Sequence, residues 1–113
     1  MKKYFACLVI LLILCVPANA KEWYQGGTLH SANIGEWKQA SYDNKLATCA
    51  DFIANLWMHN KLKINVAHMD TLKIYAKELV TCIDKATDGI DDVNDQSVSS
   101  IAAMGMTMME WIK

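Results

Sequence analysis

The stretch 41–57, SYDNKLATCADFIANLW, decides the fold of this chain. Its apolar residues recur at steps of three and four, which places them on one face of an α-helix: Tyr42, Leu46, Cys49, Ile53 and Trp57. Cys49 lies in the middle of this face. A second amphipathic helix carrying Cys82 could therefore pack against it, and the pattern predicts a fold built from helices.

The predicted first helix begins before this stretch. Asn33 can cap a helix, and Glu36, three residues later, completes a capping box. The pattern continues to position 58, although four residues of poor helix propensity adjoin at 41–44. One long helix or two shorter ones would both fit. The segment 60–69 predicts a connector, either a short extended piece or the frayed end of a helix.

Two more amphipathic helices are predicted downstream. One starts at Asp70 and stops near Gly89, and the other starts from a cap at Asp95 or Ser97 and reaches Ile112. The loop between them, 88–95, is strongly acidic. There is no internal repeat and no strand-rich stretch, so we predict a single all-α domain of three to four helices over 21–113, with an extended arm at 21–32.

The first twenty residues have the pattern of a secretory signal peptide. Lys2 and Lys3 precede an apolar run over 5–17, and Ala18-Asn19-Ala20 is a small-x-small cleavage site. The run is shorter than the ~20 residues that a spanning helix needs. We therefore expect cleavage after Ala20, a periplasmic mature protein and no stable membrane anchor.

Export determines how the cysteines are interpreted. Cys7 and Cys15 leave with the signal peptide, and the mature chain keeps Cys49 and Cys82. An even pair in an oxidising compartment predicts one disulfide. In the chain-entropy model such a bridge stabilises a domain by roughly 3 to 4 kcal/mol. A redox or metal-binding pair is the alternative, but the two residues lack CxxC spacing.

The charge pattern argues against nucleic acid and anionic lipid as partners. Every basic residue is a lysine, and removing Lys2 and Lys3 leaves nine lysines against twelve carboxylates, a net charge of −3. A basic stripe and arginine forks are both missing from this composition. The partners we expect are proteins.

The arm at 21–32 carries two neighbouring aromatic residues, Trp23 and Tyr24. They can pack over the helices as a lid, or form an exposed patch that recognises a partner. Gly26-Gly27 predicts a turn. It lacks the third glycine and the preceding strand of a phosphate-binding loop, so we assign no nucleotide cofactor.

Two metal sites can be considered from the sequence. Asp84, Asp88, Gly89 and Asp95 fit some positions of a calcium loop, but the bidentate glutamate at the last position is missing. Methionine and histidine pairs could bind Cu(I), which prefers sulfur ligands. The methionines also suit helix packing and adaptable protein binding, so we predict no metal site.

Signatures of catalysis are also missing. The three histidines lie near predicted helix ends, outside any GxSxG or HExxH context, and the carboxylates show no pairing. We predict a protein that is not an enzyme.

Two short segments resemble a known family. The segment 48–52, TCADF, is similar to the T-C-x-D-F segment that opens the first core helix of HdeA/HdeB-like periplasmic acid-stress chaperones. The segment 80–82, VTC, lies where their second cysteine closes the disulfide. The resemblance implies a small helical protein, dimeric at rest, that loosens at low pH and holds unfolding clients. The same framework also resembles periplasmic immunity proteins that neutralise secreted amidase toxins.

We therefore expect a protein that binds other proteins, and the most specific version of this hypothesis is an HdeA-like holdase. The alternatives are a periplasmic immunity protein and a copper-binding protein. In the holdase reading, protonation of the carboxylates in 88–95 exposes the binding surface. The last helix has too many apolar residues for one face, which predicts a homodimer or a docked partner. The residues expected to bind partners are Trp23, Tyr24, Met104, Met106, Met108, Met109 and Trp111.

Overall fold

The computed structural model describes residues 22–113, and over this range the chain is helical. Its elements are α2 (Ile34–Gln39), α3 (Tyr42–Met58), α4 (Met69–Thr87), the 3-10 turn η2 (Asp91–Val93) and α5 (Val98–Met108). No strand occurs in this range, and the predicted all-α class is confirmed. The predicted signal peptide at 1–20 lies outside the described residues.

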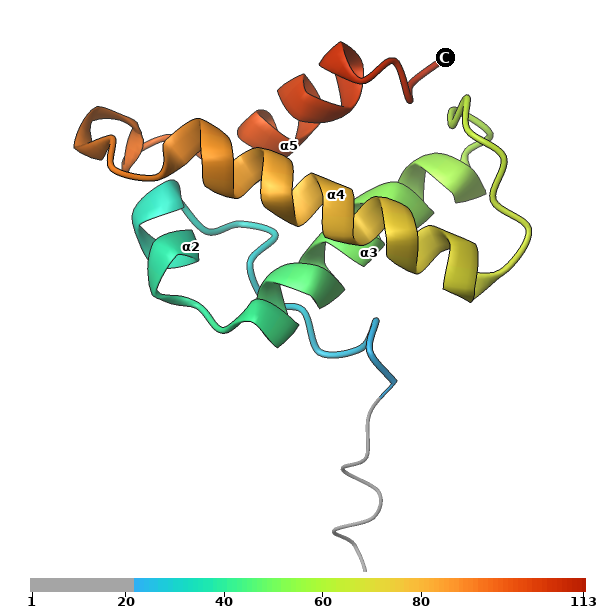
Figure 1. Ribbon diagram of the computed structural model, residues 1–113, viewed down its shortest axis with the longest axis horizontal. Helices are drawn as coiled ribbons and strands as arrows, with labels where there is room; N and C mark the ends of the chain where they lie inside the picture. The colour runs from blue at the N-terminus through green and yellow to red at the C-terminus, as the bar shows by residue number, and fades with distance from the viewer. Residues whose placement is uncertain (1–21) are drawn as a thin grey trace, which may run out of the picture.

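Helix α4 lies at the centre of the fold and contacts both α3 and α5, an arrangement that Figure 1 shows with α4 crossing α3. The predicted apolar face of α3 is buried in its middle, at Leu46, Cys49 and Ile53. At its two ends Tyr42 and Trp57 are 51% and 41% exposed. Both end residues therefore extend beyond the area that α4 covers.

The predicted first helix is two helices. The capping box at Asn33 is confirmed, because its side chain accepts from the Glu36 amide while the Glu36 side chain accepts from the Asn33 amide. Ala40 is extended and ends α2. Ser41 then caps α3 by accepting a hydrogen bond from the Asn44 amide. The residues of poor helix propensity therefore form a new N-terminus.

Helix α4 begins one residue earlier than predicted. Its N-cap is His68, whose side chain makes no capping hydrogen bond. The helix ends at Thr87, followed by an extended Asp88. Gly89, with φ +73°, takes the left-handed conformation expected of a residue that stops a helix.

Helix α5 starts as predicted, at a Ser97 cap, but it is shorter than predicted. It ends at Met108, and Glu110 has φ +60°, a left-handed conformation that turns the chain back. Trp111 and Ile112 therefore lie outside the helix. The prediction that the helix continues to Ile112 is wrong, because the 3.6-residue pattern is continued by the apolar residues of this returning segment.

Backbone bridges hold both ends of α5. Ser97 pairs with Asn33 at the start of the helix, and Ile112 pairs with Leu62 beyond its end. At the second bridge the Lys63 amide donates to the Trp111 carbonyl at 2.6 Å, and the Lys113 amide donates to the Lys61 carbonyl at 2.8 Å. Of the two conformations expected for the connector, the structure shows the extended one, which pairs with the C-terminal segment.

A polar contact links α2 to α4 inside the apolar core. Trp37 is fully buried, and its indole Nε1 donates to the Asp84 carboxylate at 2.8 Å. Lys45 donates to the same oxygen at 3.2 Å and lies 5.3 Å from the centre of the indole ring. Asp84 therefore supplies the acceptor that the indole N–H requires in the core.

Candidate protein-binding surface

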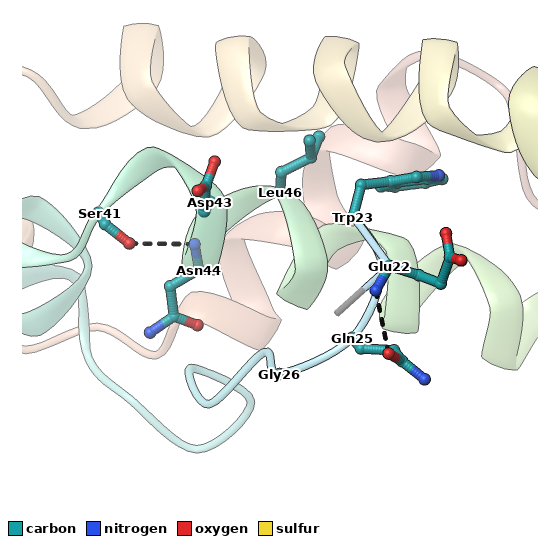
Figure 2. A pocket seen from close by; sticks show the side chains of 8 residues that line it. All are labelled: Glu22, Trp23, Gln25, Gly26, Ser41, Asp43, Asn44 and Leu46. Carbon is teal, nitrogen blue, oxygen red and sulfur yellow. Dashed lines mark hydrogen bonds between the residues drawn. The ribbon is translucent and has the colours of Figure 1, made fainter. Parts of the chain in front are cut away.

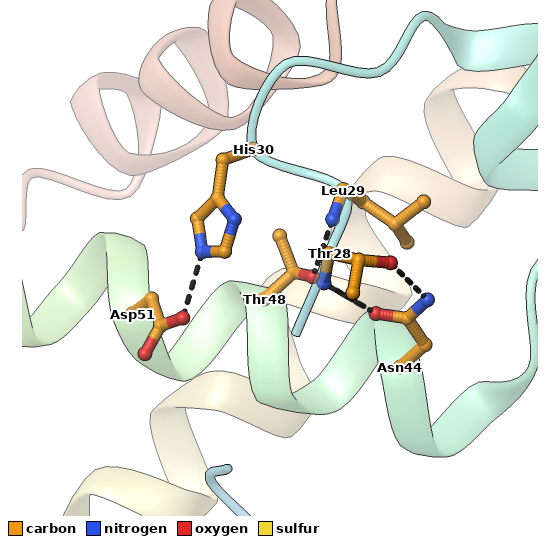
Figure 3. Close-up of polar contacts among 6 residues, drawn as sticks. All are labelled: Thr28, Leu29, His30, Asn44, Thr48 and Asp51. Carbon is orange, nitrogen blue, oxygen red and sulfur yellow. Dashed lines mark hydrogen bonds and ion pairs between the residues drawn. The ribbon is translucent and has the colours of Figure 1, made fainter. Parts of the chain in front are cut away.

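The N-terminal arm runs along one face of α3. Side chains at spacings of four and three residues on this helix bind it in order: Asn44, Thr48 and Asp51. The Asn44 side chain accepts from the Thr28 amide at 2.8 Å, and the Thr48 hydroxyl accepts from the Leu29 amide at 3.2 Å. Figure 3 shows these contacts. The arm is therefore an integral part of the helical domain.

A histidine–carboxylate pair ends this row of contacts. His30 Nε2 lies 2.7 Å from Asp51 Oδ2, and the imidazole ring meets Phe52 edge to face at 5.8 Å between ring centres. Both side chains of the pair are nearly half exposed. The pair thus adds a third side-chain contact between the arm and α3.

Gly27 allows the arm to approach α3 this closely. A Cβ on this residue would lie 2.6 Å from the Thr48 nitrogen and 2.8 Å from the Thr48 Cα. Both are backbone atoms inside a helix, which cannot move aside. The glycine pair predicted as a turn therefore also serves a close backbone contact.

Trp23 and Tyr24 form a lid, one of the two arrangements expected from the sequence. Both are half-buried and pack edge to face, with ring centres 5.5 Å apart. Lys73 of α4 lies 5.5 Å from the centre of the Trp23 ring. The aromatic pair is thus engaged with the core, and the structure does not present it as an open patch.

A polar cavity of about 610 Å³ lies between the arm and the start of α3. Figure 2 shows its lining, which includes Glu22, Trp23 and Asp43. Three other polar side chains of the lining bind nearby groups: Ser41 accepts from the Asn44 amide, Asn44 binds Thr28, and Gln25 accepts from the Glu22 amide.

The last helix divides the predicted partner-binding residues into two groups. Met104 is 58% exposed and Met108 is 79% exposed, while Met109 is half-buried. The prediction is wrong for Met106 and Trp111, which are each 5% exposed. Met106 points from the opposite side of α5 into the core, and the turn after the helix brings Trp111 onto Tyr75 of α4, 5.2 Å between ring centres.

The exposed side of α5 is an uncharged stripe. We call it the methionine face and define it by Ser100, Ala103, Met104, Thr107 and Met108, all exposed. Between Asp95 and Glu110 the chain carries no charged residue. An apolar groove of about 290 Å³ lies along the face, and a second of about 380 Å³, lined in part by Cys82 and Met109, lies where α5 meets α4.

The predicted Cys49–Cys82 disulfide is not formed in the structure, where both residues are free thiols. Cys82 is directed toward α5, since its Sγ would lie 2.9 Å from a Cβ on Gly105. Cys49 is fully buried, and burial raises the pKa of its thiol far above the ordinary range, with smaller rises from Asp84 and from Cys82 itself. Lys45 acts in the opposite direction and lowers the pKa of the Cys49 thiol, the smallest of these effects.

Neither a cluster of metal ligands nor a membrane-spanning helix occurs among residues 22–113. No three His, Cys, Asp or Glu side chains gather in this range as a metal site would require. None of its helices combines the length and the apolarity needed to cross a membrane. The methionines considered for Cu(I) do not converge either, because Met106 lies in the core while Met104 and Met108 face outward.

The sequence did not reveal the polar contacts that organise the domain. The sequence pattern suggests a role for Asp84 only in a calcium loop, yet its carboxylate accepts hydrogen bonds from both Trp37 and Lys45. The row formed by Asn44, Thr48 and Asp51 was also missed. Their spacing along one face of the predicted helix could have indicated it, because the backbone amides of a non-helical arm need hydrogen-bond acceptors.

Comparisons with known proteins returned nothing: no family model, no curated protein and no solved structure matches this chain. The resemblance to the HdeA/HdeB-like chaperones therefore stays a prediction.

Proposed function

We propose that this chain is an exported protein-binding protein without catalytic activity, and that it binds other proteins through the methionine face of α5. The observation that carries the proposal is the exposure of Met104 and Met108 on a helix side that carries no charge. Flexible thioether side chains adapt to apolar partners of varied shape. The two apolar grooves beside α5 extend the surface available to a partner.

In its most specific version, the proposal is that the protein is a holdase, a chaperone that binds unfolded proteins, and that it works under acid stress. Asp88, Asp91, Asp92 and Asp95 are exposed, and no lysine or histidine among the described residues forms an ion pair with them. Their protonation removes charge beside the start of α5 and breaks no ion pair. This change makes the surroundings of the methionine face more apolar, which favours unfolded clients.

Two other carboxylates could make the stability of the fold depend on pH, because they form ion pairs within it. Asp51 pairs with His30 of the arm, and Asp84 accepts from Trp37 and Lys45. Protonation would remove the ionic part of both contacts, which are the two ion pairs among residues 22–113. We propose that low pH thereby loosens the arm and α2 and enlarges the apolar surface next to α5. This differs from the mechanism expected from the sequence, in which the 88–95 carboxylates act alone.

The Met104→Lys/Met108→Lys variant tests the proposed function. It should lose most of its ability to suppress aggregation of an acid-denatured client, measured by light scattering at low pH and at neutral pH. Met58→Lys is the matched control, because Met58 is 79% exposed, as Met108 is, and lies at the end of α3. Equal suppression by all three proteins, or none by the wild type at either pH, would contradict the proposal.

We also propose that Cys49 and Cys82 form a disulfide after export. They lie on paired helices, Cys49 buried and Cys82 half-buried. An oxidising compartment supplies the electron acceptor that joins them. The bridge would fix α4 against α3 while acid loosens other contacts.

The redox state should control alkaline stability. In the reduced protein the Cys49 thiol of the unfolded chain ionises at the ordinary pKa of a free thiol, 9.0, while the buried thiol of the folded chain stays neutral. Stability is therefore full below pH 9 and should fall by about 1.4 kcal/mol per pH unit above it. The oxidised protein lacks this titration. Urea unfolding from pH 7 to 10.5, together with free-thiol counts, checks both points. Two reactive thiols in native exported material would contradict the bridge.

A further inference from the structure

The two ends of α5 lie in regions of opposite charge. Its start follows an acidic loop with four exposed aspartates and no ion pair among the described residues: Asp88, Asp91, Asp92 and Asp95. Lys38 binds this loop through the Ile90 carbonyl and the Asn94 side chain rather than through a carboxylate, and Lys85 precedes the loop in the last turn of α4. The four carboxylates therefore make this end of α5 acidic.

The other end of α5 is rich in lysine. The Leu62–Ile112 bridge brings the connector against the C-terminal segment and gathers three exposed lysines there: Lys61, Lys63 and Lys113. Glu110 is the single carboxylate of this segment. Figure 1 shows the acidic loop at one end of the molecule and the connector with the C-terminus at the other. The uncharged methionine face lies between them.

From this order of charges we infer that the methionine face binds a second copy of the chain, with the two α5 helices antiparallel about a two-fold axis. The inference rests on the proposed function, in which this face is a protein interface. An antiparallel pairing places the acidic loop of each copy against the lysine end of the other. A parallel pairing would place like charges together at both ends.

The composition of the face suits a helix paired with its own copy. Small residues, Ala103 and Thr107, alternate with the large Met104 and Met108, so that large side chains of one copy can fill the spaces over small ones of the other. A stable interface buries about 800 Å² per partner, which is more than one helix face supplies. The contact must therefore extend to both charged ends, where the complementary residues lie.

The first test is the oligomeric state of the wild-type protein and two point variants. In sedimentation equilibrium the wild type should be dimeric and should dissociate more readily as salt rises. Met108→Lys should be monomeric, because it places a charge inside the apolar contact. Met58→Lys, equal in exposure but outside the face, should remain dimeric. Thermal melting of each variant confirms that it is folded.

The second test exchanges the charges. Asp88→Lys/Asp91→Lys/Asp92→Lys leaves three lysines against Asp95 in the loop and so makes both ends of α5 basic, and Lys61→Glu/Lys63→Glu makes both ends acidic. Each variant alone should bind itself at least about tenfold more weakly than the wild type. An equimolar mixture should recover a dimer with one chain of each kind, because every contact is then between opposite charges. A docked partner of another kind would give no such recovery.

Several outcomes would overturn the antiparallel dimer. These are a wild type that is monomeric up to about 1 mM, a dimeric Met108→Lys variant, or a charge-exchanged mixture that stays monomeric. The proposed function fails separately. If the wild type is monomeric but Met108→Lys loses client protection, the face binds clients and not a second copy. If Met108→Lys is monomeric yet protects clients fully, the dimer stands and the proposed function does not.

Discussion

Asp84→Ala is expected to lower the free energy of unfolding by about 3 kcal/mol. The Trp37 indole N–H would lose its acceptor inside the core, and an unsatisfied buried donor costs about 1 to 3 kcal/mol. Lys45, whose side chain is only 14% exposed, would also lose its partner. For a domain of this size such a loss lowers the melting temperature by more than about 10 °C. Thermal and urea unfolding at neutral pH measure it.

Asp84→Asn is the matched control, since its amide oxygen can still accept from Trp37 while the charge for Lys45 is gone. Its cost should be about 1 kcal/mol. The Trp37→Phe background gives a second control, because there Asp84→Ala has no indole N–H to leave unsatisfied and should cost less. Equal costs for the Ala and Asn variants would show that the indole hydrogen bond contributes nothing.

Gly27→Ala is expected to detach the N-terminal arm from α3. The added Cβ would lie 2.6 Å from the Thr48 nitrogen, so the arm has to lift away. The amide hydrogen bonds of Thr28 and Leu29 would be lost, and Leu29, now 6% exposed, would enter water. Two hydrogen bonds and one leucine contribute about 3 kcal/mol together. Urea unfolding should show this loss, and limited proteolysis should cleave the arm before the helices.

Gly35→Ala provides the comparison. A Cβ there meets Asn33 Oδ1 at 3.3 Å and nothing closer, and alanine favours the α2 helix. Its stability should change by less than about 1 kcal/mol. If Gly27→Ala is equally mild and the arm resists protease, the close backbone contact has no energetic role.

The sequence predicted the parts of this fold that depend on local periodicity. The buried middle of α3, the capping box at Asn33 and the Ser97 cap of α5 all follow from side chains within one or two turns. The cap at Ser41 was harder to see, because serine and asparagine lower helix propensity inside a helix but favour its N-terminus. The same residues therefore allowed either a continuous helix or a break.

The errors arose where distant segments determine the conformation. Met106 and Met108 are the same residue type two positions apart. Only the packing of α5 on α4 buries Met106 and leaves Met108 on the surface. The sequence pattern places Trp111 on a helix that in fact ends before it, because the left-handed Glu110 is stabilised by a bridge to the remote Leu62 segment. The sequence predicted an excess of apolar residues on the last helix, but not which of them are exposed.

The two bridges of α5 also impose an order on folding. Helices α3 and α4 are joined by the short connector 59–68, so their pairing closes a small loop at low entropic cost. The partners of α5 at both ends, Asn33 and Leu62, are far away in sequence. Contacts between such distant residues form late. The connector 88–97 between α4 and α5 is equally short, so we expect α5 to pack on α4 first and its two bridges to form afterwards.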